Sequence, residues 1–264
     1  MRNRFSFGAN WTSFNFISGP QQLEYSKLHL ENLIGTKSIA NVKIIDIGSG
    51  SGLHAQSFLE LGAKFVKCID IDRESVQTTI DRLNAYSADT WSVEIADILD
   101  IEVVEREKYD VVFSWGVLHH TGNLFLALQN ASNFCKPGGL LVLAIYRKTW
   151  LCNFWKLEKR LYNNCPLFFR RIIDLAFASL ILIAKWILGT SPRTHIQEYS
   201  KRRGMDFMTD IRDWLGGFPY ESANPKQIEN ILADKGFFLL HSNIRKRQIG
   251  FFGSGCNEYV FQRR

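Results

Sequence analysis

The sequence lacks the cysteine patterns of disulfide frameworks and zinc clusters. It contains five cysteines, an odd number, and no two of them form a Cys-x-x-Cys pair. Small secreted domains and zinc modules both depend on paired, closely spaced cysteines. We therefore expect a protein of a reducing compartment without a metal site, and predict that it is cytoplasmic.

Secretory and membrane-spanning segments are missing as well. Residues 1–14 contain no apolar run followed by a small-residue cleavage site, so we expect no secretory signal. The most apolar segment, residues 172–188, is interrupted by Asp174 and Lys185. A transmembrane helix needs about 20 apolar residues, so this segment is too short to span a bilayer.

What is present is enough chain for one large α/β domain with an insertion. The 264 residues are 46% hydrophobic and 22% charged, which is ordinary for a globular protein. The net charge of +6 favours an acidic partner such as nucleic acid, an anionic ligand or a membrane surface. Charge alone does not choose among the three.

Short apolar runs alternate with helical patterns up to residue 146. Runs typical of buried strands occupy 42–47, 65–70, 91–95, 109–114 and 139–145. Helical patterns occupy 20–36, 52–61, 74–86 and 122–134. Strands that alternate with helices predict βαβ units and a parallel sheet.

The pattern changes after residue 146. Residues 147–216 are helical, aromatic and basic in character, and a further helix at 224–236 precedes two apolar runs at 237–244 and 257–262. The last two runs predict an antiparallel pair of strands. We therefore predict an N-terminal helical cap segment at 1–36, a core of 37–146 and 217–264, and a helical insertion at 147–216.

Three glycines follow the first strand at alternate positions, Gly48, Gly50 and Gly52. A glycine-rich turn between a strand and a helix lets a ligand approach the backbone closely. The dinucleotide pattern Gly-x-Gly-x-x-Gly fails because Leu53 stands at its third glycine, and no P-loop lysine follows. This spacing favours a different ligand of the adenosine type.

Acidic residues follow the second and third predicted strands. Asp70 ends the second strand, Asp72 comes two residues later, and Asp97 follows the third strand. A carboxylate at the end of the second strand can bind both hydroxyls of a ribose. Asp97 is placed to accept a hydrogen bond from an adenine amine.

These motifs together resemble the class I S-adenosylmethionine-dependent methyltransferases. The resemblance covers about residues 37–146, including Asp-Ile-Gly-Ser-Gly-Ser-Gly at 46–52 and Lys-Pro-Gly-Gly at 136–139. It implies a doubly wound, Rossmann-like α/β fold with a seven-stranded sheet whose last strand is antiparallel. The cofactor it implies is S-adenosyl-L-methionine, with S-adenosyl-L-homocysteine as product.

The same resemblance implies the cofactor-binding residues. The glycines would make room for the methionine portion, Asp46 would lie near its amino group, and Trp11 would offer a π-face to the sulfonium. The expected set is Asp46, Gly48, Ser49, Gly50, Ser51, Gly52, Asp70, Ile71, Asp72, Asp97, Ile98, Ser114, Trp115 and Trp11.

The segment Ser-Trp-Gly-Val-Leu-His-His at 114–120 bears on the methyl acceptor. It is similar to the corresponding stretch of O-methyltransferases of ubiquinone biosynthesis and lacks the Asn/Asp-Pro-Pro-aromatic motif of amino-directed nucleic-acid methylases. Histidine titrates near neutral pH, so His119 or His120 is the candidate base that removes a hydroxyl proton. Either histidine could instead only shape the pocket or cap the next helix.

We expect the insertion to be the substrate lid, and the sequence allows more than one partner for it. Basic residues flank its apolar segment: Lys156, Lys159, Arg160, Arg170 and Arg171 before it, and Lys201, Arg202 and Arg203 after it. They favour either peripheral membrane contact through 170–203 or a solvated helix in a lid or homodimer.

For function we expect methylation of a phenol, sugar or lipid-linked hydroxyl; an RNA-directed enzyme and a non-catalytic cofactor-binding protein are the alternatives.

Overall fold

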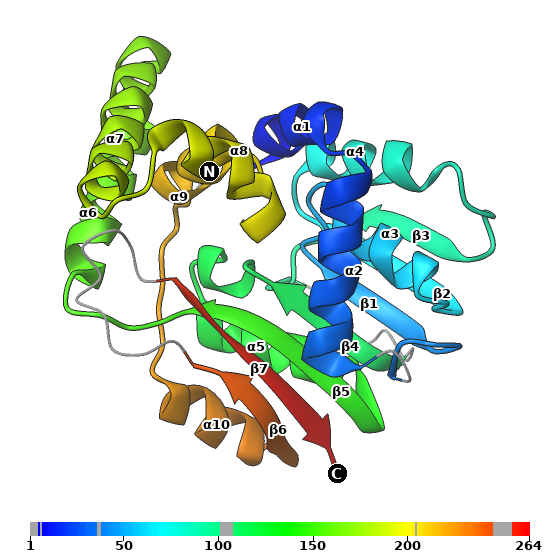
Figure 1. Ribbon diagram of the computed structural model, residues 1–264. Coiled ribbons are helices and arrows are strands. Elements are labelled where there is room, and N and C mark those ends of the chain that lie inside the picture. The colour runs from blue at the N-terminus through cyan, green and yellow to red at the C-terminus, as the bar shows by residue number, and fades with distance from the viewer. Residues whose placement is uncertain (1–4, 6, 36–37, 101–107, 204, 245–254) are drawn as a thin grey trace.

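The computed structural model describes residues 5, 7–35, 38–100, 108–203, 205–244 and 255–264. Its centre is a seven-stranded sheet in the order β3-β2-β1-β4-β5-β7-β6 (Figure 1). The strands are β1 Lys43–Ile47, β2 Phe65–Asp70, β3 Trp91–Ile95, β4 Tyr109–Trp115, β5 Cys135–Tyr146, β6 Phe237–Asn243 and β7 Cys256–Arg263.

The predicted sheet is confirmed, including the direction of its last strand. β1 pairs in parallel with β2 and β4, whereas β7 runs antiparallel to both of its neighbours, β5 and β6. The strand order changes direction between β1 and β4. In open α/β sheets, ligands bind at the carboxyl ends of the strands at such a switch point.

Helices cover both faces of the sheet because both sets of alternating strand residues are apolar. One face packs against α2 (Pro20–Ile34), α3 (Leu53–Glu60) and α4 (Arg73–Leu83), and the other against α5 (Leu124–Asn133) and α10 (Pro225–Ala233) (Figure 1). Neighbouring strand residues such as Ile44 and Ile45 belong to opposite cores and are fully buried. These layers hold the strand ends in fixed positions.

Two elements differ from the predicted ones. A further helix, α1 (Gly8–Ile17), precedes the predicted helix at 20–36 and contains Trp11. Strand β5 starts at Cys135, before the predicted run at 139–145, and Cys135 pairs with Tyr109 before a register shift. Helix α1 packs on α4. Tertiary contacts therefore stabilise a short helix whose apolar residues show too little periodicity for it to be predicted from the sequence.

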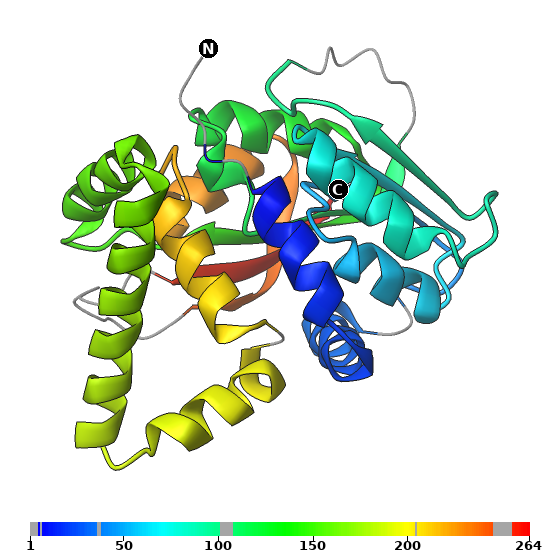
Figure 2. The same cartoon turned by 90° about the horizontal axis from the view of Figure 1, so that it is seen from above.

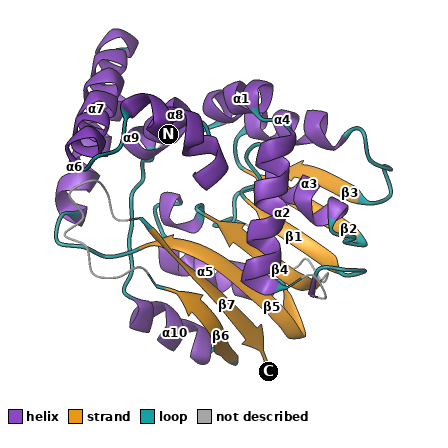
Figure 3. Cartoon of the chain, in the orientation of Figure 1, coloured by secondary structure: helices purple, strands orange, loops and turns teal. Residues whose placement is uncertain are grey.

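Helices make up the described segment between β5 and α10 (Figures 2 and 3). They are α6 (Cys152–Asn164), α7 (Leu167–Ile187), α8 (Pro192–Arg203) and α9 (Phe207–Gly216). In the described residues no single helix meets the length and hydropathy criteria for crossing a membrane. Among the helix pairs that the structure describes, α7 with Pro192–Tyr199 meets them together, and that pair is bent by 113°.

Candidate active site

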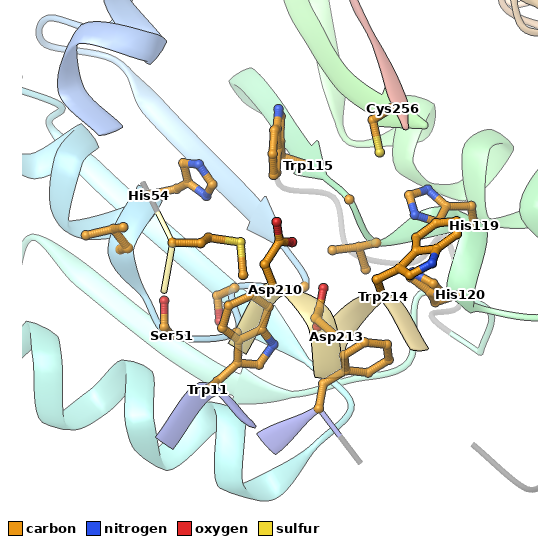
Figure 4. A pocket seen from close by; sticks show the side chains of 18 of the residues that line it. Trp11, Ser51, His54, Trp115, His119, His120, Asp210, Asp213, Trp214 and Cys256 are labelled. Atoms are coloured by element: carbon orange, nitrogen blue, oxygen red, sulfur yellow. The ribbon is translucent and has the colours of Figure 1, made fainter. Parts of the chain in front are cut away.

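A cavity of about 820 Å³ opens at the carboxyl ends of the strands. One part of its wall comes from the turns after β1, β2, β3 and β4 together with α1, and another part comes from α7 and α9. Figure 4 shows side chains of both parts pointing toward the same space. The sheet edge and the helical insertion therefore share one site.

The glycine turn is built for close approach. Gly48, Gly50 and Gly52 all have positive φ angles, of 79°, 56° and 72°, which L-residues with a side chain rarely adopt. A Cβ at Gly48 would lie 2.4 Å from Val117, and one at Gly50 would lie 3.0 Å from Trp11 Nε1. Both backbone geometry and space thus require glycine at these two positions.

The turn is tied to the acid at the end of β2. Asp70 accepts hydrogen bonds from the backbone N–H of Gly50 at 3.0 Å and of Asp72 at 2.9 Å. Asp72 caps α4 through the N–H of Glu74 at 2.9 Å and also accepts from Gly8 N at 3.1 Å. Burial raises the pKa of Asp70 to about 6. A ligand donor at this carboxylate would therefore favour its charged form.

Most residues of the expected cofactor set meet at this cavity. Its wall includes Gly48, Ser49, Gly50, Ser51, Asp70, Ile71, Asp72, Asp97, Ile98, Trp115 and Trp11. Asp46, Gly52 and Ser114 do not line it. Gly52 precedes α3, and Ser114 donates its hydroxyl proton to the carbonyl of Ile47 at 3.0 Å.

Asp46 is buried behind the glycine turn. Its side chain belongs to β1, and its Oδ2 has no hydrogen-bond partner among the described residues. Burial, with a smaller repulsion from Asp70, raises the pKa of Asp46 to about 8. Buried carboxyl oxygens are normally hydrogen-bonded, so this oxygen is able to accept a further donor.

His119 and His120 both line the cavity and are held in different ways. The Nδ1 atom of His119 accepts from Tyr146 N at 3.4 Å, which places its proton on Nε2; that atom is buried without a partner in the described structure. The Nδ1 atom of His120 donates to the carbonyl of Pro219 at 2.8 Å, which leaves Nε2 unprotonated. Burial holds the pKa of His119 far below its usual range and lowers that of His120 to about 4. Both rings are therefore neutral at physiological pH.

Sequence reasoning missed the acids that the insertion contributes. Asp210 and Asp213 point from α9 into the cavity, beside Trp214 (Figure 4). Burial, and secondly repulsion from Asp210, raises the pKa of Asp213 to about 7. The only signal in the sequence is the spacing of two acids three residues apart on a helix, which is common on solvated faces.

The cavity is acidic although the chain is basic. Its described wall carries the carboxylates of Asp70, Asp72, Asp97, Asp210, Asp213 and Glu258, and no lysine or arginine. The Oε1 atom of Glu258 is hydrogen-bonded to His29 Nε2 at 2.8 Å and accepts from Trp115 Nε1 at 3.0 Å. Such a cavity electrostatically favours neutral or cationic ligands over anionic ones.

The comparisons with known proteins agree with this geometry. A protein-family model described as a methyltransferase domain matches residues 45–141. This segment of the core is therefore similar to a methyltransferase domain. The matched region contains the glycine turn, Asp70, Asp97 and both histidines, but none of α6–α9.

Curated relatives and solved structures are similar to the chain at different levels. Ubiquinone biosynthesis O-methyltransferases from Neisseria meningitidis serogroup C and Maricaulis maris are each 27% identical, over 127 and 168 residues. These matches cover 47% and 62% of this chain, and 52% and 54% of the relatives. The chain thus spans about half the length of the curated relatives it matches.

Among solved structures, magnesium protoporphyrin IX methyltransferase from Synechocystis PCC 6803 with bound S-adenosylhomocysteine aligns with a TM-score of 0.54. It is 15% identical, and the alignment covers 92% of this chain and 84% of the other. An N-methyltransferase from Bradyrhizobium japonicum WM9 aligns with a TM-score of 0.51 at 15% identity, over 93% and 88% of the two chains. These likenesses confirm the fold of the methyltransferase domain.

Proposed function

We propose that this chain transfers a methyl group from S-adenosyl-L-methionine to a hydroxyl oxygen of a small molecule. The observation that carries the proposal is one cavity in which the glycine turn and Asp70 face a pair of neutral histidines. The match of residues 45–141 to a methyltransferase domain supports it. S-adenosyl-L-methionine supplies an electrophilic methyl group on a positively charged sulfur.

The described residues fit this cofactor. The cleared space at Gly48 and Gly50 suits the methionine portion, and Asp70 suits the two ribose hydroxyls. Asp97 lines the same cavity and can accept from the adenine amine. Trp11 stands over Gly50, where its ring would favour a nearby sulfonium. The unpartnered Oδ2 of Asp46 would accept a hydrogen bond from a water that bridges it to the amino group of the cofactor.

The acceptor end has the groups for deprotonating a hydroxyl. His120 offers an unprotonated Nε2 that can take the proton, and His119 can donate from Nε2 to orient the oxygen. Asp213, with its pKa near 7, is the second candidate base because it lines the same cavity. An acceptor held between these groups and the methyl donor reacts in line, and proximity provides much of the rate.

The charge of the cavity bears on the acceptor class. Six acidic side chains, with no lysine or arginine on the described wall, disfavour a phosphate-rich acceptor such as RNA. Aromatic side chains, including Trp214 and Tyr146, provide apolar surface for a ring or chain. We therefore favour a neutral or cationic phenol, sugar or lipid-linked acceptor.

Calorimetric titration of the purified chain with S-adenosyl-L-methionine and S-adenosyl-L-homocysteine tests the proposal, with Asp70→Ala as the test variant. Loss of the two ribose hydrogen bonds should weaken binding by at least about 100-fold, because bonds to a charged group contribute about 1.5–3 kcal/mol each. The control is Asp81→Ala, an exposed acid of α4 that accepts from Gln77.

The expected result is that the control binds the cofactor and Asp70→Ala does not. The next measurement is then the transfer of labelled methyl groups to a panel of phenols, sugars and lipid-linked acceptors. No binding by a folded protein would refute the cofactor assignment. Tight binding without transfer to any acceptor would favour the non-catalytic alternative.

A further inference from the structure

The outward side of α7 is apolar along its whole length. The outer face of α7 consists of Phe168, Phe169, Ile172, Leu175, Leu180, Ile183, Trp186 and Ile187, which are 48–73% exposed. These residues recur at intervals of three and four, so they share one side of the helix. Ala176 and Ser179 fill the same side and are also exposed, so no charged residue interrupts it.

The opposite side of α7 is the one that carries charge and contacts the protein. Asp174 is buried there and accepts from the hydroxyl of Tyr162 at 2.7 Å, with Arg212 Nε at 3.6 Å. Phe177 and Ile181 reach the acidic cavity from this side. Ile173, Phe177 and Leu182 also pack from this side against the buried cluster that includes Phe207, Ile211 and Leu215 of α9. Helix α7 is therefore apolar on both sides, whereas a surface helix normally presents a polar side to solvent. The outer face of α7 therefore requires a partner.

Helix α6 and the preceding loop extend this surface. Phe154, Leu157 and Leu161 of α6 are 56–58% exposed, and Trp150 is 96% exposed. Figures 1 and 2 both place α7 at the outer edge of the molecule, away from the sheet. An exposed apolar patch of this extent marks an interaction site on a protein surface.

The charges around the patch have one sign. Lys148, Lys156, Arg160, Arg171 and Arg193 are exposed. The acids between residues 147 and 199 are Glu158, Asp174 and Glu198; Asp174 is buried and the other two are half-buried. The partner must therefore offer apolar surface together with negative charge.

We propose that the outer face of α7, with the exposed residues of α6, docks this protein on an anionic lipid bilayer. The helix would lie in the plane of the interface, with its apolar side chains at the acyl boundary and the basic side chains at lipid phosphates. A second copy fits less well, because a two-fold contact through this face would bring two sets of basic side chains together. The inner side of α7 lines the cavity, so docking would bring the cavity close to the lipid.

Vesicle flotation tests the proposal with the full chain. Binding is measured to vesicles of phosphatidylcholine alone and of phosphatidylcholine mixed with phosphatidylglycerol. The test variants are Phe168→Gln with Trp186→Gln for the apolar face, and Lys156→Gln with Arg160→Gln for the charges. The matched control is Phe16→Gln with Leu240→Gln, two apolar residues that are 87% and 49% exposed elsewhere.

We expect the wild-type chain to bind anionic vesicles and each test variant to bind them about tenfold more weakly or worse. The control should bind like wild type, and roughly 1 M salt should weaken binding by screening the charges. Absence of wild-type binding, equal binding to neutral vesicles, or unchanged binding of the test variants would each overturn the proposal. A dimer that the Phe168→Gln, Trp186→Gln variant disrupts, without vesicle binding, would identify a second copy as the partner instead. Vesicle binding needs no methyl acceptor, so its failure is separate from a failure of the proposed activity.

Discussion

The sheet edge and the helical insertion contribute to the same cavity in opposite ways. At the sheet edge, Asp70 is held by backbone N–H groups two and twenty residues away in sequence. In the insertion, Asp213 faces Lys159 of another helix, which is itself fully buried against the ring of Trp214 at 3.7 Å. The first arrangement is set by turns that follow two adjacent strands of the sheet, and the second depends on how separate helices pack.

The two regions also differ in whether they match a known protein family. Residues 45–141 match a methyltransferase domain, and this range ends before α6. The glycine turn, Asp70 and the two histidines therefore lie in the matched region, whereas the cavity residues of α7 and α9 lie outside it. Variants in the two regions test whether the sheet edge or the helical insertion controls the catalytic rate and the affinity for the ligand.

The largest expected effect concerns which region supplies the base. If His120 of the sheet edge takes the proton, His120→Gln should lower kcat by about 10²–10⁴-fold, the usual contribution of a general base. Asp213→Asn should have the smaller effect. The measurement is kcat/KM against pH, since a base is active only when unprotonated and activity rises with pH through its pKa.

The position of that rising limb is diagnostic. The pKa of His120 is lowered to about 4 by burial, so its limb should lie in the acidic range and be complete at neutral pH. Burial raises the pKa of Asp213 to about 7, so its limb should cross neutrality. A limb near pH 7 that disappears in Asp213→Asn would move the base to the insertion.

The next effect concerns the rigidity of the sheet edge. Gly48→Ala should lower the free energy of unfolding by at least about 2 kcal/mol, because the residue has a positive φ and its Cβ would collide with Val117. Gly62→Ala is the control: φ is +88° there but no atom lies within 4 Å, so we expect a loss of about 1 kcal/mol. Urea unfolding measures both variants. Equal losses would mean that Val117 moves aside freely.

The smallest effect concerns Trp11, which α1 brings to the sheet edge from the N-terminal segment. Trp11→Leu should weaken binding of S-adenosyl-L-methionine by about 1 kcal/mol if the ring faces the sulfonium. S-adenosyl-L-homocysteine lacks that positive charge, so its binding should change less. Calorimetric titration with both ligands is the measurement. An equal loss of affinity for the two ligands would indicate that Trp11 only packs against them. The control is Trp150→Leu, because Trp150 is exposed.

Much of the sheet could be predicted because its pattern is local. Apolar runs bounded by turns located all seven strands to within a few residues, apart from the early start of β5 at Cys135. The glycine turn and Asp70 followed from spacing and resemblance, and the structure brings them to one cavity. Helix α1 was missed because its stability comes from contact with α4 rather than from its own pattern.

The insertion was harder to predict for a physical reason. Lys159, expected among the exposed basic residues, is fully buried, donates to the carbonyl of Trp214 and lies 3.6 Å from Glu158. Helical periodicity shows which residues share a side but not which side meets the protein. The side chains of residues 201–203, also part of the expected basic flank, lie outside what the structure describes.

The sequence by itself determined the sheet, the glycine turn and the acid at the end of β2, because strand alternation and turn chemistry act over a few residues. Only the tertiary structure decided that Asp210 and Asp213 line the same cavity as the histidines, that Lys159 is buried and that one apolar side of α7 stays exposed. These features depend on contacts between segments far apart in the chain. A helix of either orientation would satisfy its own backbone equally well, so packing alone chooses between them.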